Sequence, residues 1–206
     1  MALHIFWLLL KTCAVVALPF VGLVRVGVWA SSRGAPPWLA VLAAGASALA
    51  LVTIVAAAAS RRLTGRVRAR WVFHRLALPL VLVYGAYGLF TLRSENARSP
   101  EVRARYGRLH PVFRLALGTA ILMDRGIVVT DLSRTPADYG RMGLPPRETS
   151  LHFPQGDGYV YAADLRTRGR AGWKNVVAVL YFKTMGFRTL RHVGTADHLH
   201  VSLPGP

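Results

Sequence analysis

Four of the seven histidines lie in the last 55 residues of the chain, together with three of its nine acidic residues. The histidines are His152, His192, His198 and His200, and the acidic residues are Asp157, Asp164 and Asp197. A catalytic zinc ion typically takes three protein ligands, often imidazoles and carboxylates, and leaves its fourth position to water. This C-terminal stretch therefore predicts a metal site.

Two of these histidines form an H-x-H pair, His198 and His200, within HLHVSL (198–203), which has the pattern of a strand. Side chains two positions apart on a strand point to the same face, about 7 Å from each other along the chain. A chance surface pair would have the same pattern. The metal interpretation gains weight because the segment from Ser150 to Asp164 supplies another histidine, His152, and another carboxylate.

Three segments carry a resemblance to a known superfamily: VVTDLSRTPADYGRMG (128–143), SLHFPQGDGYVYAADLRT (150–167) and GFRTLRHVGTADHLHVSLP (186–204). Together they resemble the Hedgehog and D-Ala-D-Ala peptidase superfamily. That group includes zinc D-Ala-D-Ala carboxypeptidases, L-alanyl-D-glutamate endopeptidases and penicillin-insensitive murein endopeptidases. The resemblance covers about residues 105–204 and does not extend to residues 1–92.

The resemblance implies that His152, Asp164 and His200 bind Zn²⁺ and that water takes the fourth position. It leaves two candidates for the general base, Asp197 and His198.

The resemblance also implies that Arg134 binds the carbonyl or carboxylate of the substrate and that Ser150 helps to orient it. His152 and Asp164 stand twelve positions apart, farther than is usual in the superfamily. The extra residues, FPQGDG, must then form a loop, and Asp157 within them is the alternative carboxylate ligand.

The expected activity is that of a zinc metallopeptidase that hydrolyses amide bonds in the stem peptides of peptidoglycan. Such an enzyme would be a D-Ala-D-Ala carboxypeptidase or a murein endopeptidase, and the pattern does not decide between these bonds. The alternative is a non-catalytic module that holds zinc and binds cell-wall peptides.

The elements expected to position these residues alternate between helices and strands, which indicates an α+β domain over residues 111–206 with an antiparallel sheet. We expect strands at 126–130, 159–165 and 198–203, and helices at 112–123, from Thr135–Pro136 onward, and at 175–184 with a stop at Gly186. In the first helix Arg114 should face solvent. Residues 93–110 are polar and predict a linker that enters a short helix.

Residues 1–92 have a different composition, with nine basic and no acidic side chains. Three apolar stretches, 3–28, 36–59 and 71–92, approach or exceed the ~20 residues that a helix needs to cross a bilayer. We expect three transmembrane helices. Two spans plus a signal or interfacial segment is the alternative. Ala40, Ala44 and Ala48 repeat at a spacing that favours close helix contact.

The arginines indicate the orientation of the chain. The stretch 60–70 (SRRLTGRVRAR) carries five arginines, and such loops usually stay in the cytoplasm. This predicts a multi-pass protein of the cytoplasmic (inner) membrane, with its C-terminal domain on the outer, periplasmic or extracytoplasmic side. The net charge of +17 does not indicate nucleic-acid binding, because the basic residues are dispersed over several loops. Lipid and wall peptides are the expected partners.

Overall fold

The computed structural model describes residues 2–141, 143, 145–194 and 197–205. Its N-terminal part contains three candidate membrane spans. They are formed by α1 (Ala2–Ser32), by α2 (Pro37–Thr64), and by α3 (Ala69–Val72), the π-helical turn η1 (Phe73–Ala77) and α4 (Leu78–Phe90). The π turn stands just before Pro79, which has no amide hydrogen for the normal helical bond. All three helices are long and apolar enough to cross a membrane.

The first two spans pack closely through small residues. Ala40, Ala44 and Ala48 are the buried residues of α2, as the four-residue repeat predicts. Gly27 of α1 lies so near that an added Cβ would stand 3.3 Å from the Cβ of Ala44. The small size of these glycine and alanine residues therefore allows the backbones of α1 and α2 to approach each other closely.

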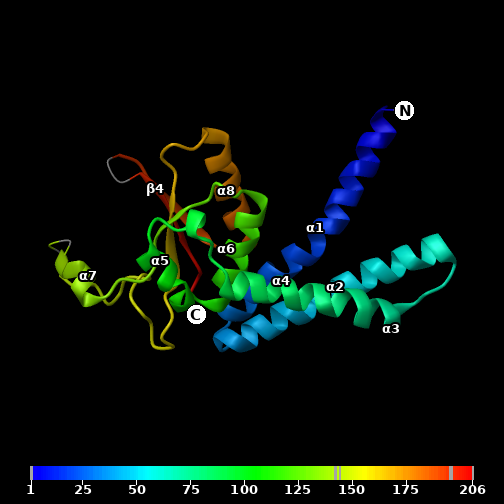
Figure 1. The fold of residues 1–206 in the computed structure, drawn as a ribbon, viewed down its shortest axis with the longest axis horizontal. Coiled ribbons are helices and arrows are strands. Elements are labelled where there is room, and N and C mark those ends of the chain that lie inside the picture. The colour runs from blue at the N-terminus through cyan, green and yellow to red at the C-terminus, as the bar shows by residue number, and fades with distance from the viewer. Residues whose placement is uncertain (1, 142, 144, 195–196, 206) are drawn as a thin grey trace.

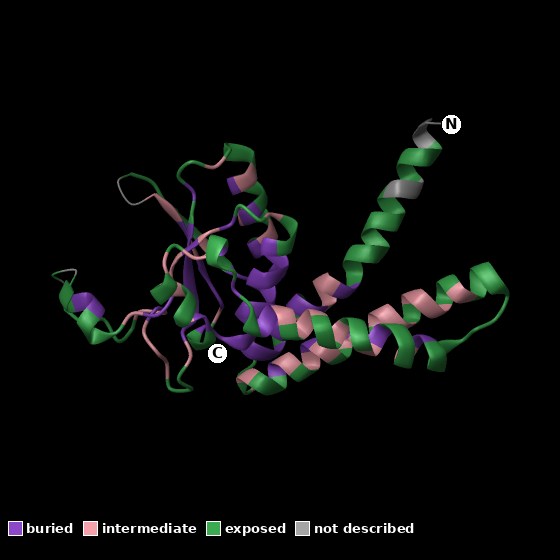
Figure 2. Ribbon diagram, viewed as in Figure 1, coloured by how far each residue is buried: buried purple, intermediate pink, exposed green. Residues whose placement is uncertain are grey.

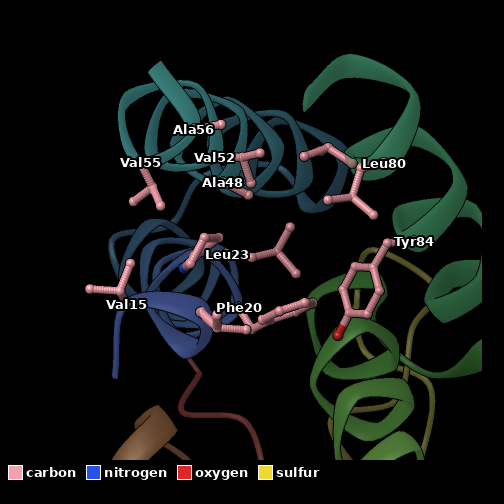
Figure 3. A pocket seen from close by; sticks show the side chains of 12 residues that line it. Val15, Phe20, Leu23, Ala48, Val52, Val55, Ala56, Leu80 and Tyr84 are labelled. Carbon is pink, nitrogen blue, oxygen red and sulfur yellow. The ribbon is translucent and has the colours of Figure 1, made fainter. Parts of the chain in front are cut away.

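The N-terminal half of α1 diverges from the other two spans (Figure 1), and its described side chains from His4 to Leu18 are exposed (Figure 2). An apolar cavity of about 230 Å³ lies where the helices separate (Figure 3). Phe20, Leu23, Val52, Leu80 and Tyr84 contribute to its walls. In a bilayer this surface would contact lipid chains.

The C-terminal part contains a four-stranded antiparallel sheet in the order β1-β2-β4-β3. The strands are β1 (Val129–Asp131), β2 (Ala162–Arg166), β3 (Arg188–His192) and β4 (His198–Ser202). The helices around it are α6 (Pro111–Met123), α7 (Pro136–Arg141) and α8 (Gly172–Met185). These elements confirm the α+β class. Gly186 ends α8 in the left-handed conformation, as predicted.

The edge strand β3 is the element that the sequence analysis missed. Its residues, RTLRH, lack an apolar alternation, and four of the five are exposed. An edge strand that covers no core needs no such pattern, and its backbone pairing with β4 holds it in place.

The spans and the sheet share one hydrophobic core. It runs from Val24 and Ala44 in the spans through Phe113 of α6 to Leu165 and Leu199 of the sheet. Helix α6 lies between the two parts, and eleven of its thirteen residues are buried. The C-terminal domain is therefore packed directly onto the spans.

This position of α6 corrects the prediction for Arg114. The side chain does not face solvent: Arg114 is 4% exposed, and its Nη1 donates to the carbonyl of Leu89, 2.7 Å away. Its guanidinium also lies 5.7 Å from the ring centre of Trp38. A helix that is covered on one side by the spans and on the other by the sheet has no solvent face there.

The segment predicted as a linker, 93–110, is packed into the domain. It contains η2 (Ser94–Asn96), α5 (Pro100–Ala104) and η3 (Tyr106–Arg108). The side-chain amide of Asn96 donates to the carbonyls of Arg125 and Ile127, at 2.9 and 2.8 Å. The hydroxyl of Tyr106 donates to the carbonyl of Gly88, 2.6 Å away. These contacts connect the end of the third span to the sheet without a free stretch of chain.

Candidate metal centre

The centre of the site is a pair of residues on adjacent strands. Asp164 of β2 and His200 of β4 lie directly opposite each other in the ladder. The Nδ1 atom of His200 stands 2.8 Å from Oδ1 of Asp164. Their neighbours in sequence, Leu165 and Leu199, point into the core on the other face. The alternation of the strands thus places the polar pair on the face away from the core.

The third member, His152, comes from the segment that precedes β2. Its Nε2 lies 3.3 Å from Nδ1 of His200 and 3.3 Å from Oδ1 of Asp164. The three candidate ligand atoms all lie within 4.8 Å of one another. The structure therefore brings together the three residues that the sequence analysis proposed as metal ligands.

The orientation of His152 suits a metal ligand. Its Nδ1 stands 2.6 Å from the carbonyl oxygen of Leu132. A carbonyl can only accept, so Nδ1 carries the hydrogen and Nε2 presents its lone pair to the site. Second partners of this kind fix the ring of metal-binding histidines. The Oγ of Ser150 accepts a bond from the backbone N–H of His152 at 3.3 Å, which supports the same turn.

Two of the three distances between the candidate ligand atoms agree with a tetrahedral ion. Bonds of about 2.0–2.1 Å at tetrahedral angles place neighbouring ligand atoms about 3.3 Å apart. Two of the three separations equal this value, and the third, between Nδ1 of His200 and Oδ1 of Asp164, is shorter at 2.8 Å. His152 and Asp164 are buried, whereas the side chain of His200 is 24% exposed. His200 is therefore the member of the group that solvent can reach.

The surroundings of Asp164 favour its ionised form. Burial alone would raise the pKa of Asp164, but its contacts with the imidazoles of His152 and His200 hold that pKa well below its usual range. Its second oxygen, Oδ2, lies 3.3 Å from Nη2 of Arg134. One oxygen therefore faces the imidazoles and the other faces a guanidinium.

Arg134 is itself held in place by Asp131, whose Oδ2 lies 2.6 Å from the Nε of the arginine. The structure thus places Arg134 beside the site, bound to two carboxylates. Asp131 was not among the residues predicted for the site, although its position three residues before Arg134 is a signal of this ion pair. The role of the Leu132 carbonyl could not be predicted from the sequence, because every residue has a backbone carbonyl.

The two candidate bases lie in different surroundings. The Nε2 atom of His198 stands 3.7 Å from Oδ1 of Asp164, and its ring stacks on His192 with centres 4.6 Å apart. Asp197 instead accepts hydrogen bonds from Arg191, at 3.0 Å, and from Thr167. These bonds lower the pKa of Asp197. The structure therefore groups His198 with the metal ligands and turns Asp197 toward Arg191.

Asp157, the alternative ligand, lies outside the group. Its two oxygens accept bonds from the backbone of Tyr159, at 3.0 Å, and from the hydroxyl of Tyr161, at 2.8 Å. The intervening residues form a turn closed by bonds between Gln155 and Tyr159 and between Gly158 and Gln155, each 2.8 Å long. The longer spacing is thus absorbed by a loop, as expected, and Asp164 reaches the site.

Comparison of the chain with protein-family models, with curated proteins and with solved structures finds no match.

Proposed function

We propose that the chain is a membrane-anchored zinc peptidase of the Hedgehog and D-Ala-D-Ala peptidase type. Its substrates would be the stem peptides of peptidoglycan. The observation that carries this proposal is the His152–Asp164–His200 group, in which two of the three separations match a tetrahedral ion and next to which His198 lies. The superfamily resemblance of residues 105–204 supplies the reaction class.

The chemistry follows from the charges of the three ligands. Two neutral imidazoles and one carboxylate leave a divalent ion with a net charge of +1, so it remains a strong Lewis acid. Bound zinc would polarise the scissile carbonyl and lower the pKa of water toward ~7. His198 would accept a proton at Nε2 and return it to the leaving amine. Arg134 would hold Asp164 and stabilise charge on the carbonyl oxygen.

The topology supports an extracytoplasmic substrate. The arginine-rich stretch 60–70 contains the turn between α2 and α3, and it lies at the end of these helices away from the sheet (Figure 1). If this loop is cytoplasmic, the domain lies on the opposite side of the membrane, where peptidoglycan is assembled. The proposal thus has three parts: the metal is zinc, the domain lies outside the cytoplasmic membrane, and the substrate is a stem peptide.

The test uses the full chain, because its two parts share a core. The purified protein is loaded with zinc in detergent and incubated with stem peptides and isolated sacculi. Mass spectrometry should detect released D-alanine or new peptide ends, and a His200→Ala variant should release none. A folded, zinc-loaded protein that leaves every substrate unchanged would contradict the proposal.

The position of Asp197 favours the alternative of a non-catalytic wall-peptide module, since an acidic base is turned toward Arg191. That alternative predicts zinc-dependent binding of stem peptides without hydrolysis at any pH. Equilibrium binding and product analysis on the same samples separate the two.

A further inference from the structure

The C-terminal domain cannot move away from the membrane, because it is packed against the spans. The last turn of α4 is bonded to the domain twice, through Arg114 to Leu89 and through Tyr106 to Gly88. A Cβ added to Gly27 of α1 would stand 3.0 Å from Val112 of α6. With a shared core and no free linker, the domain is fixed to the ends of the spans.

The loop that joins the first two spans marks the level of the membrane surface. Trp29 and Trp38 flank it and are exposed. Exposed tryptophans at the ends of spans favour the headgroup layer. Arg33, within the loop, lies over the ring of Trp29 at 5.0 Å. The residues between α1 and α2 should therefore meet the lipid headgroups.

The loop that carries His152 lies next to the loop between α1 and α2, with a cavity between them. A cavity of about 370 Å³ is bounded on one side by Ser31, Pro36 and Pro37 and on the other by Leu151, Gln155 and Asp157. Leu151 is the direct neighbour of the metal ligand His152. A cavity at the surface of the membrane thus borders the segment that builds the metal site.

We propose that the substrate of this site is a peptide attached to a lipid of the same bilayer, and that the cavity receives the part of the substrate nearest the membrane. This inference rests on the proposed function. The site belongs to a domain that is fixed to the ends of the spans, so it meets lipid-attached peptides at high effective concentration. It cannot reach peptides held several domain diameters away in a mature wall.

The experiment places the zinc-loaded full chain in vesicles with a stem peptide that ends in D-Ala-D-Ala and is attached to a lipid. The same peptide is supplied free in solution, or attached to lipid in separate vesicles. We expect the peptide in the shared bilayer to be hydrolysed at least about tenfold faster than either comparison. Equal hydrolysis of all three overturns this inference alone. Hydrolysis of none overturns the proposed function and this inference with it.

A variant tests whether the substrate occupies the cavity or is only concentrated at the membrane. Gly156 lines the cavity, has no atom within 4 Å of an added Cβ and has no positive φ, so Gly156→Phe should fold and fill space there. Gly107, equally open and exposed on η3, supplies the matched control Gly107→Phe. Only the first should slow hydrolysis of the lipid-attached peptide, and neither should change that of the free peptide. If Gly156→Phe leaves both rates unchanged, the cavity is not used and the proposed binding site is wrong.

Discussion

The two carboxylate oxygens of Asp164 contact different kinds of side chain, histidines on one side and an arginine on the other. Oδ1 faces His152, His198 and His200, while Oδ2 faces Arg134. Such a division fixes the carboxylate so that one oxygen alone is offered to an ion. The same contacts place His198 beside the carboxylate, which makes this histidine the stronger candidate for the general base.

Substitution distinguishes the two candidate bases. His198→Ala should lower kcat by about 10²–10⁴-fold, the usual contribution of a general base, while the protein keeps its zinc. Asp197→Asn should change kcat little, because the Asp197 carboxylate bonds to Arg191 and Thr167. Steady-state kinetics and metal analysis on both variants provide the check. The opposite pattern would identify Asp197 as the base.

Among the elements, α7 is joined by a charged pair to Arg105, the residue that follows α5. Arg105 donates to both oxygens of Asp138, at 2.8 and 3.2 Å, and the backbone N–H of Thr135 donates to Oδ2 at 2.7 Å. The bond from Arg105 is the main reason that the pKa of Asp138 lies well below its usual range. The pair links the start of α7 to the domain, next to the segment that carries Arg134.

The stability of this link should depend on pH in a defined direction. A depressed pKa in the folded state means that the pair stabilises α7 above the ordinary carboxyl pKa of ~3.9, and that this effect is lost as the pH falls further. At neutral pH, Asp138→Asn should speed amide exchange in residues 135–141 by about ten- to a hundredfold, since a hydrogen bond to a charged group is worth ~1.5–3 kcal/mol. The difference should shrink near pH 3, after correction for intrinsic exchange. A difference that does not change with pH would rule out this role.

The crossing of α4 and α6 depends on two glycines. A Cβ on Gly118 would stand 2.9 Å from the Cα of Gly88. Gly118→Ala should therefore destabilise the protein by about 1–3 kcal/mol, because backbone cannot move aside easily. Gly45→Ala in α2 is the matched control, since no atom lies within 4 Å of its added Cβ. Thermal unfolding in detergent should show a lower Tm for the first and an equal or higher Tm for the second.

These elements show what sequence patterns can and cannot predict. The three spans and the polar face of β4 follow from long apolar runs and from the H-x-H spacing, which depend on local chemistry alone. Arg114 was assigned to the wrong surroundings because its burial comes from the docking of the spans, which no local pattern records. Strand β3 and the Leu132 carbonyl were missed because they act through backbone atoms.

In the whole molecule, the membrane part and the C-terminal domain form one folding unit. Residues 93–206 alone would expose the buried face of α6, including Val112, Leu115 and Ala116. We expect that fragment to aggregate or to lack fixed tertiary structure, whereas the full chain in detergent should be monodisperse. Size-exclusion chromatography and near-ultraviolet circular dichroism provide the comparison. A soluble, folded fragment that binds zinc would show that the shared core is dispensable.

The most direct test of the account is the zinc environment of the full chain, measured by metal analysis and X-ray absorption spectroscopy. We predict one zinc per chain, with two imidazole nitrogens and oxygen ligands at about 2.0–2.2 Å, one of them exchangeable with solvent. Asp164→Asn should weaken zinc binding by about 100-fold or more, while Asp157→Asn should leave it unchanged. Failure to bind zinc, or a site closed by four protein ligands, would contradict the claim that His152, Asp164 and His200 form an open metal centre.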